Sequence, residues 1–355
     1  MSKIKLGVIF GGMSTEHEVS ITSGTSVIKN LDKEKYEIYP IYIDKDGNWF
    51  EYTKKIQDID IIEVGEEIKE KTKIINPIEY IQECDVIFPV LHGLYGEDGT
   101  IQGMLELLNK PYVGCKVLSS SISMDKVYAK FIFENSNIDQ AKYVYIRSYN
   151  DKYIYIDKEF NETIVNLDDI AKIVENKLGY PVFVKPSNSG SSIGINKAKN
   201  KLELEKYIEE AAKYDRKILI EEEIKGREVE CAILGNEDVM ASGVGEILSA
   251  EEFYTFDAKY KNNASRTVIP ADIDEKIVKK IRETAIKAFK AVDGKGFARV
   301  DFFVENKTND IKIIEINTIP GFTQISMYPK LWEQEGVAYG ELLDKLIDLA
   351  LEENK

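Results

Sequence analysis

Two β-strands joined by a short polar loop are predicted by residues 297–318, FARVDFFVENKTNDIKIIEINT. If residues 306–310 form the loop, Asp301 lies opposite Glu315 and Arg299 lies opposite Asn317, all on one side of the sheet. The other side is apolar and consists of Val300, Phe302, Val304, Ile314 and Ile316. The stretch therefore predicts an antiparallel hairpin with one face in a core and the other available for polar chemistry.

The polar face of this hairpin suits a metal ion. Facing side chains lie ~4.5–5.5 Å apart at Cβ, and two carboxylates at that distance repel each other unless a cation lies between them. Oxygens of Asp301, Glu315 and Asn317 converge in this way, and Mg2+ is usually held by few protein oxygens plus substrate phosphates. The alternative is a solvated hairpin face on which Arg299 and Asp301 form a surface ion pair.

A second candidate site is the loop of small residues at 185–194, KPSNSGSSIG, which one strand enters and another strand leaves. Small residues let backbone N–H groups approach phosphate oxygens, and Lys185 can reach the same anion. The loop is neither a GxxxxGK[ST] motif nor a GxGxxG motif, and no helix opens after it. A phosphate-binding loop and a plain flexible hairpin loop both remain open.

The N-terminal part of the chain has the pattern of a small, mostly parallel α/β domain. Buried strands are predicted at 3–10, 36–43 and 85–90, and the first is followed by the tight loop 11–15 and a helix. In sheets of this kind, ligands usually bind beyond the carboxyl ends of the strands. We therefore expect the loops after these strands to contribute to a binding site.

Two of those loops carry polar side chains, GGMSTEHEVSITSG at 11–24 and HGLYGEDGT at 92–100. In the first loop Ser14 is a candidate helix cap, while Glu16 and Glu18 also suit the positive end of the helix. In the second loop a helix is predicted to begin near residue 99 or 100. Each loop has a structural explanation as well as a functional one.

Beyond the N-terminal part, the pattern changes. A helix from about residue 124 is predicted to place Met124, Val127, Tyr128 and Phe131 on one face and Lys126 with Lys130 on the other. From about residue 182 the strands alternate as in antiparallel sheets, and the run EEE at 221–223 is typical of a solvated strand edge. The polar, aromatic stretch 249–270 has no periodicity and is either a lid or a packed loop.

The composition excludes several classes of function. The chain has 355 residues and a formal net charge of −15 at pH 7, from 47 Lys and Arg against 62 Asp and Glu. This acidity argues against nucleic acid or an anionic membrane as the main partner, because such binding needs a concentrated cationic surface. With His17 and His92 as the only histidines, a multi-histidine zinc site is excluded.

The cysteines and the hydropathy pattern point to the cytoplasm. Cys84, Cys115 and Cys231 lie far apart in the sequence and form no CxxC pair, which suits a reducing compartment. No apolar run approaches the ~18 residues of a membrane span. We expect a cytoplasmic protein of two or three domains whose main partner is a small molecule.

Eight motifs occur in order along the chain: GGMSTEHEVSITSG, LHGLYGEDGTIQG, SMDKVYAK, VKPSNSGSSIG, LIEEEIKGREVE, FYTFDAKY, GFARVDFF and EINTIPGFTQIS. Together they closely resemble the D-alanine:D-alanine ligases, members of the ATP-grasp superfamily. The resemblance implies an α/β (α+β ATP-grasp) fold with an N-terminal Rossmann-like parallel-sheet domain at 1–122. Two antiparallel-sheet ATP-grasp lobes are implied after it, a central one at 123–224 and a C-terminal one at 225–355 with the lid loop and the metal site.

The resemblance also implies the reaction. One D-alanine carboxylate attacks the γ-phosphate of ATP, and the amine of a second D-alanine then displaces phosphate from the acyl phosphate. The product serves peptidoglycan synthesis and hence the cell wall and cell shape. The implied cofactors are ATP and two Mg2+ ions, which Mn2+ can replace, and the implied assembly is a cytoplasmic homodimer without nucleic acid or membrane partners.

Residue roles follow from the same resemblance. For the first D-alanine, Glu16 holds the ammonium group and His92 lies near the carboxylate, whereas Ser326 binds the carboxylate of the second, beside Met327. The implied nucleotide-binding residues are Lys126 and Lys185 on the phosphates, Ser192 in the loop, Glu221, Glu222 and Ile224 at the adenine, and Glu228 on the ribose. The implied metal ligands are Asp301, Glu315 and Asn317. Arg299 and the backbone of Gly321 stabilise the oxyanion, Ser191, Tyr260 and Glu16 connect the closed lid, and Lys259 neutralises the moving phosphoryl group.

Alternatives within and outside this family stay open. A D-alanine:D-serine ligase is one, because IFGGMSTEHEVS, VIFPVLHG and NTIPGFT also look like that branch, although the apolar Met327 favours a methyl side chain in the acceptor. The sequence departs from the common family pattern at Glu222, where Lys is frequent, and at Gln324-Ile325. From other classes, a non-catalytic nucleotide-binding regulator is disfavoured by the complete set of site residues, and a nicotinamide oxidoreductase by the lack of GxGxxG.

Overall fold

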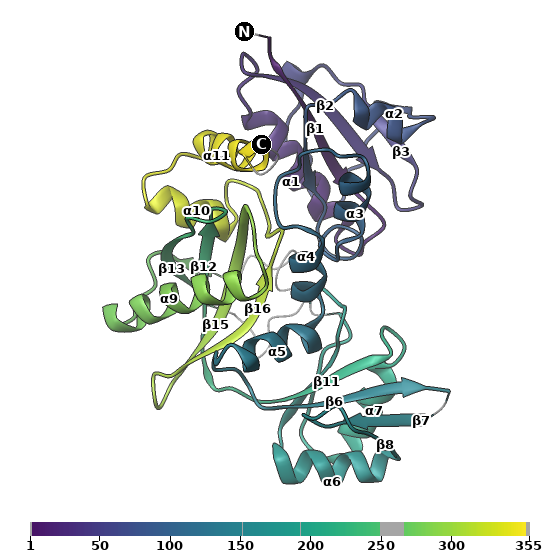
Figure 1. Ribbon diagram of the computed structural model, residues 1–355, viewed down its shortest axis with the longest axis vertical. Helices are drawn as coiled ribbons and strands as arrows, with labels where there is room; N and C mark the ends of the chain where they lie inside the picture. Colours follow the sequence, from purple (N-terminus) through teal and green to yellow (C-terminus); the bar gives the residue numbers. More distant parts are fainter. Residues whose placement is uncertain (1, 151, 192, 249–265, 353–355) are drawn as a thin grey trace.

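The structure is a computed structural model that describes residues 2–150, 152–191, 193–248 and 266–352. Three β-sheets follow one another along the longest axis, each with helices packed against it (Figure 1). The N-terminal sheet lies at one end and the sheet of residues 143–222 at the other, with the sheet of residues 226–317 between them. Among the described helices, none is long and apolar enough to cross a membrane.

The N-terminal sheet has the order β4-β3-β2-β1-β5 and confirms the predicted parallel strands. Its strands are β1 (Ile4–Gly11), β2 (Tyr36–Ile43), β3 (Trp49–Tyr52), β4 (Lys71–Lys73) and β5 (Val86–Val90). Its helices are α1 (His17–Asn30), η1 (Ile56–Asp58), α2 (Pro77–Gln82) and α3 (Thr100–Leu107). β1 pairs in parallel with β2 and β5, while β3 and β4 form an antiparallel edge.

Strand β1 is apolar at successive positions because both faces of the sheet are covered. Val8 and Phe10 pack into a cluster with residues of α1 and of the C-terminal helix α11 (Tyr339–Glu352). Ile9 points to the opposite side and packs with residues of α2 and α3. The core of the N-terminal sheet is therefore completed by the C-terminal helix.

The second sheet is antiparallel, in the order β10-β9-β11-β6-β7-β8. Its strands are β6 (Tyr143–Tyr149), β7 (Lys152–Ile156), β8 (Glu162–Val165), β9 (Val182–Pro186), β10 (Asn196–Ala198) and β11 (Lys217–Glu222). Helices α4 (Val117–Met124) and α5 (Lys126–Asn135) lead into the sheet, and α6 (Leu167–Lys177) and α7 (Lys201–Ala211) cover it. The strands at 182–186 and 196–198 flank the predicted small-residue loop.

The third sheet is also antiparallel, in the order β14-β13-β12-β15-β16. Its strands are β12 (Gly226–Leu234), β13 (Met240–Leu248), β14 (Arg266–Val268), β15 (Phe297–Glu305) and β16 (Ile311–Asn317). Helix α9 (Glu275–Ala291) buries Ile281, Ala285 and Phe289 against it, and α10 (Met327–Gln334) follows β16 (Figure 1). The hairpin predicted at residues 297–318 is thus formed by β15 and β16.

The hairpin register is as predicted at one end and different at the other. Asp301 pairs with Glu315 and Arg299 with Asn317, but an irregularity between residues 301 and 302 brings Val304, not Glu305, opposite Ile311. As a result Ile313 is buried with the core cluster, and Ile314, predicted for that face, is only half-buried. One extra residue in β16 reverses the side on which the residues beyond it point.

Two predictions about helices are wrong. Lys130, expected on a polar face of α5, is 3% exposed, whereas Tyr128, expected on the apolar face, is 48% exposed. A buried carboxylate partner, described below, compensates for the burial of Lys130. Ser14 does not cap α1, which begins at His17 with Glu16 in the cap position; the Ser14 hydroxyl instead accepts the backbone N–H of Glu16 at 2.9 Å.

Candidate active site

The polar face of the β15–β16 hairpin is built around Asp301. Arg299 donates from Nε and Nη2 to the two carboxylate oxygens of Asp301, each at 2.7 Å, and the Asn317 amide nitrogen donates to Oδ2 at 2.9 Å. Glu230 on the neighbouring strand β12 lies 3.0 Å from Arg299 Nε. Burial alone lowers the pKa of Arg299, but the attraction of Asp301 and Glu230 outweighs it and raises that pKa well above its usual range.

Lys126 connects this hairpin to the small-residue loop. Its Nζ lies 3.4 Å from the carboxylate of Glu315 and donates to the carbonyl of Ser189 at 2.8 Å. The backbone N–H of Lys126 donates to the carbonyl of Ser187 at 3.1 Å. The N-terminus of α5, the loop after β9 and the end of β16 therefore meet at one lysine.

A buried carboxylate between two lysines lies on the second sheet. Glu221, expected on a solvated strand edge, is 7% exposed, and its two oxygens lie 2.5 Å from Lys130 Nζ and from Lys185 Nζ. Burial alone would raise the pKa of Glu221, but the two ammonium groups lower it to about 2. For Lys185, burial is outweighed by the attraction of Glu221, Glu315 and Glu228, so its pKa is raised.

The remaining predicted nucleotide residues lie at the start of β12 and the end of β11. Glu222 is half-buried and accepts the backbone N–H of Lys142 at 2.8 Å. Ile224 and Glu228 are half-buried, and Glu228 is close enough to Lys185 to raise its pKa. Ser192, Lys259 and Tyr260 lie outside the described residues.

Glu16 and Ser191 come from different domains and form a hydrogen bond in which the Ser191 hydroxyl donates to the Glu16 carboxylate. Glu16 is 7% exposed, and glycines make room for it. A Cβ on Gly93, whose φ is +75°, would lie 3.1 Å from Glu16 Oε2 and 2.8 Å from Ser14 Oγ. A Cβ on Gly190 would lie 3.2 Å from Glu16 Oε1. The carboxylate of Glu16, which is predicted to bind the first substrate, is thus enclosed by two loops of small residues.

The two histidines are both buried. Burial lowers the pKa of His92 to about 4, so the ring is neutral near pH 7, and its nitrogens lie 2.8 Å from the carbonyl of Ile319 and 2.8 Å from the hydroxyl of Ser23. No role was predicted for His17. Its Nδ1 lies 2.6 Å from the carbonyl oxygen of Gly12, and its Nε2 lies 3.3 Å from the hydroxyl of Tyr42. His17 therefore supports the first loop.

Glu97 is a buried acid in the loop after β5. It accepts the backbone N–H of Gly93 at 2.8 Å and that of Ile319 at 2.9 Å. Burial, followed by the nearby charge of Glu16, raises the pKa of Glu97 to about 8. The N-terminal domain thereby contacts the segment that follows β16.

The segment after β16 contains Gly321 and Ser326. A Cβ on Gly321 would lie 3.3 Å from Ser326 Oγ, so the two predicted residues are neighbours. Ser326 Oγ accepts the backbone N–H of Thr323 at 3.1 Å and lies 2.8 Å from its hydroxyl. Met327 is 6% exposed and packs in the apolar core, where its sulfur closely approaches Gly245.

Several residues of this region were not predicted to be site residues. Four of them stand inside the quoted motifs: Ser23, Glu97, Lys130 and Glu230. Their neighbours in the motif were the available signal. Tyr339 stands in no such motif, and only the packing of α11 brings it to the site.

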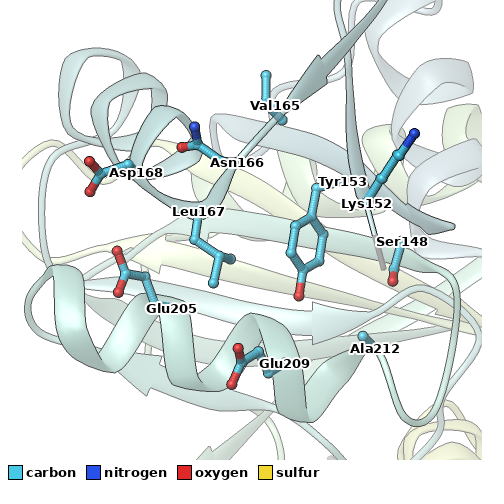
Figure 2. A pocket seen from close by; sticks show the side chains of 10 residues that line it. All are labelled: Ser148, Lys152, Tyr153, Val165, Asn166, Leu167, Asp168, Glu205, Glu209 and Ala212. Atoms are coloured by element: carbon cyan, nitrogen blue, oxygen red, sulfur yellow. The ribbon is translucent and has the colours of Figure 1, made fainter. Parts of the chain in front are cut away.

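A separate groove of about 940 Å3 lies on the second sheet, away from these residues. Figure 2 shows Tyr153 and Leu167 on one side of it and Glu205 and Glu209, on helix α7, on the other. None of the predicted site residues lines it. The groove is therefore not part of the candidate active site.

The cluster of Arg299, Asp301, Glu315 and Asn317 has the donor set for a hard cation. Two carboxylates and an amide lie at paired strand positions, with Lys126 beside one carboxylate. Within the described ranges, no group of three or more His, Cys, Asp or Glu side chains could enclose a metal by itself. A site of this kind suits Mg2+ that also binds substrate phosphates.

Comparisons with known proteins agree with this arrangement. Residues 5–115 match the family model of the D-ala D-ala ligase N-terminus, and residues 133–348 match that of the D-ala D-ala ligase C-terminus. The D-alanine–D-alanine ligase of Clostridium novyi (strain NT) is 50% identical over 353 residues, which are 99% of this chain and 98% of that protein.

Solved structures give the same result. The VanG D-Ala:D-Ser ligase of Enterococcus faecalis has a TM-score of 0.84 at 36% identity, covering 98% of this chain and 100% of that one. The D-alanine–D-alanine ligase of Bacillus anthracis in complex with ATP has a TM-score of 0.74 at 30% identity, covering 99% of this chain and 98% of that one. The chain therefore belongs to the D-alanine–D-alanine ligase family.

Proposed function

We propose that this chain joins two D-alanine molecules to D-alanyl-D-alanine at the expense of ATP. The observation that carries the proposal is the meeting of three elements at Lys126, which contacts both Glu315 on the hairpin and the small-residue loop. This contact supports the proposal that the loop binds phosphate next to a metal ion held by the two carboxylates of the hairpin. Relatives that are named D-alanine–D-alanine ligase, and whose sequences are 50% and 51% identical over 99% of this chain, support D-alanine as the substrate.

In the first step, a carboxylate oxygen of the first D-alanine bonds to the γ-phosphorus of ATP, and the bond from that phosphorus to ADP breaks. Lys126 and Lys185 hold the phosphate charge, and Lys185 leaves Glu221 to do so. Glu16 holds the ammonium group of the first D-alanine, and His92 lies near its carboxylate. Positioning and charge neutralisation supply most of the rate enhancement in phosphoryl transfer.

In the second step, the amine of the second D-alanine bonds to the acyl carbon, and the carbon–oxygen bond to phosphate then breaks. The attacking amine is the free base, and the proton that the nitrogen loses as the amide forms is taken up by the departing phosphate. Arg299 and the N–H of Gly321 stabilise the tetrahedral oxyanion, while Ser326 holds the acceptor carboxylate. One oxyanion donor is worth on the order of 100-fold in rate.

The metal ligands of the proposal are Asp301, Glu315 and Asn317. When bound, two Mg2+ ions, or Mn2+ in their place, neutralise the phosphate oxygens of the nucleotide. In the present structure Arg299 and Asn317 already bind Asp301, so the hairpin residues are held in place before any ligand arrives. That preorganisation favours a cation held by few protein ligands.

Adenine and lid contacts complete the proposal. Glu221, Glu222 and Ile224 lie against the adenine and Glu228 binds the ribose, with Ser192 at the phosphates. Ser191 and Glu16 join Tyr260 in closing the lid, and Lys259 neutralises the transferred group. Closure has a physical reason, because water hydrolyses an exposed acyl phosphate.

The proposal extends to the organisation of the protein. We divide the chain into domains 1–122, 123–224 and 225–355, each of which contains one sheet. We further propose a cytoplasmic homodimer that supplies the dipeptide for peptidoglycan.

The test is direct. Purified protein with ATP, Mg2+ and D-alanine is expected to release one phosphate per dipeptide, as measured by phosphate assay and mass spectrometry. Chelation with EDTA is expected to abolish turnover, and Mg2+ or Mn2+ to restore it. Absence of dipeptide with D-alanine under these conditions contradicts the proposal.

A second candidate is ligation of D-alanine to D-serine, favoured by the structural likeness to the VanG D-Ala:D-Ser ligase. Against it, the residue that follows Ser326 in the sequence is the apolar Met327, although its side chain packs in the core. Equal concentrations of D-alanine and D-serine as acceptors separate the two by product mass. A predominance of D-alanyl-D-serine contradicts the first assignment.

A further inference from the structure

The segment between β16 and α10 is anchored on both sides of Gly321. The backbone N–H of Ile319 donates to Glu97 at 2.9 Å, and its carbonyl lies 2.8 Å from His92 Nδ1. The backbone N–H of Phe322 donates to the hydroxyl of Ser23 at 3.2 Å, and its carbonyl accepts the hydroxyl of Tyr339 at 2.5 Å. Both backbone groups of both residues are thus bound by side chains.

The directions of these hydrogen bonds follow from the chemistry of the groups. A carbonyl only accepts, so His92 Nδ1 carries the proton that bonds to Ile319. In the neutral ring Nε2 must then accept, and the hydroxyl of Ser23, at 2.8 Å, is its donor. The lone pair of that hydroxyl receives the N–H of Phe322. The tautomer is assigned from this network, and each of its members has a defined role.

Ser23 is the junction of the network. It lies on α1 and is completely buried, and its single hydroxyl joins the imidazole of His92 to the backbone of Phe322. The removal of this hydroxyl leaves a buried N–H and a buried imidazole nitrogen without their partner. Unpaired buried polar groups are costly, so the segment relaxes away from this position.

We propose that Ser23 is a positioning residue for the second chemical step, because it fixes the segment that presents the N–H of Gly321 to the oxyanion. The inference rests on the proposed function. Ser23 acts through Phe322 and His92 and does not touch the reacting atoms. Through Ser23, the N-terminal domain determines the geometry of an oxyanion donor that belongs to the C-terminal domain.

The consequence is specific to one half of the reaction. A displacement of about 1 Å can cost on the order of 100-fold in rate when a group must be aligned with the transition state. Loss of the Ser23 hydroxyl therefore slows aminolysis of the acyl phosphate more than its formation. The intermediate then waits longer, and water consumes a larger share of it.

The experiment compares Ser23→Ala with Ser120→Ala. Ser120 is also a fully buried helical serine, on α4, and its hydroxyl donates to the carbonyl of Cys115 at 3.3 Å, outside the candidate site. Two quantities are measured for each full-length variant: dipeptide formed per phosphate released, and the hydrogen exchange rates of the amides at 318–323. Ser23→Thr, which keeps the hydroxyl, serves as the conservative variant.

For Ser23→Ala we expect kcat for dipeptide to fall by about 10- to 100-fold with the KM for ATP within about twofold, and the dipeptide-to-phosphate ratio to fall. Exchange at 318–323 is expected to accelerate at least about tenfold, while Ser120→Ala leaves both quantities unchanged and Ser23→Thr restores the ratio. An unchanged ratio with unchanged exchange overturns the proposal, as does exchange that accelerates equally throughout the molecule. If the wild-type protein forms no dipeptide, the proposed function fails, and the exchange measurement alone decides whether Ser23 anchors the segment.

Discussion

Arg299 is paired with two acids at the candidate site. It binds both oxygens of Asp301 and lies 3.0 Å from Glu230, so its charge is balanced by acids on its own strand and the next. Only the guanidinium group can make both parallel contacts with one carboxylate and still approach a second. The side chain of Arg299 is thereby held in one orientation by acids on β15 and β12.

We predict that Arg299→Ala lowers kcat for dipeptide formation by about 100-fold or more, because an oxyanion donor is lost. ATP binding, measured by calorimetry, is expected to persist. Arg282→Ala is the matched control. Arg282 lies on helix α9, and its guanidinium group donates to the carbonyl of Ala241. Turnover of the Arg299 variant equal to that of the control contradicts the oxyanion role.

Glu221 gives a prediction about pH. Its pKa is about 2 in the folded protein against 4.5 for the free group, so the unfolded chain binds a proton that the folded chain does not between these values. The stabilisation is present above pH 4.5 and is lost as the pH falls toward 2, by on the order of 3 kcal/mol. Urea unfolding from pH 6 to pH 3 is expected to show a shallower pH dependence for Glu221→Gln than for wild type.

The control for this prediction is Glu237→Gln. Glu237 pairs with Lys295 at the surface, and its side chain is 89% exposed, so its replacement is expected to leave the free energy of unfolding close to that of the wild type. At neutral pH, Glu221→Gln is expected to destabilise by about 3–5 kcal/mol, because Lys130 and Lys185 stay buried without their partner. Equal pH profiles for the two variants rule out the buried triad as a source of stability.

Among the larger elements, the loop after β5 lies against Glu16, the residue proposed to hold the first D-alanine. Gly93 has a φ of +75°, and a Cβ there would lie 3.1 Å from the Glu16 carboxylate. We predict that Gly93→Ala costs about 1–2 kcal/mol of stability from the backbone and also displaces Glu16, raising the KM for D-alanine. Unfolding experiments and steady-state kinetics measure the two effects separately.

Gly65 is the matched control for Gly93. Its φ is +95°, and a Cβ there would have no neighbour within 4 Å. Gly65→Ala is therefore expected to show the backbone cost alone, with the KM for D-alanine unchanged. A KM that rises equally in both variants contradicts the steric role of Gly93.

The β15–β16 hairpin shows how far strand patterns lead. The period-two alternation correctly paired Asp301 with Glu315 and Arg299 with Asn317. The polar residues at the end of the hairpin away from the loop are consistent with only one register. It misplaced Ile314, because Ile313 and Ile314 are both apolar and the pattern does not show which of them faces the core. The register at the end that carries the predicted metal ligands could be predicted, and the bulge could not.

Across the whole molecule, the parts of the site that escaped prediction are those with distant partners. The burial of Lys130, on helix α5, depends on its ion pair with Glu221 of strand β11. Helical periodicity carries no information about such a contact. His92 and Ser23 meet Ile319 and Phe322 only because the first and third sheets pack together. Motifs locate residues along the chain, whereas hydrogen-bond partners depend on the assembled domains.

The C-terminal helix α11 couples the ends of the chain. Leu346 is completely buried in the cluster that also contains Phe10 of β1. We predict that Leu346→Ala lowers the free energy of unfolding by about 2–5 kcal/mol and accelerates hydrogen exchange in β1 as well as in α11. Exchange confined to α11 contradicts the shared core.

Leu107→Ala is the control for this prediction, because Leu107 is 89% exposed at the end of α3. Its effect on the free energy of unfolding is expected to stay within about 0.5 kcal/mol. If Leu107→Ala loses as much stability as Leu346→Ala, the result contradicts a special role of α11.

The position of α11 also matters while the protein is being made. The strands of the N-terminal sheet leave the ribosome first, yet their apolar face lacks the part of its cover that α11 provides until that helix has been synthesised. At about 5–20 residues per second, the delay is on the order of tens of seconds. During translation the nascent chain therefore leaves part of this hydrophobic face open to solvent.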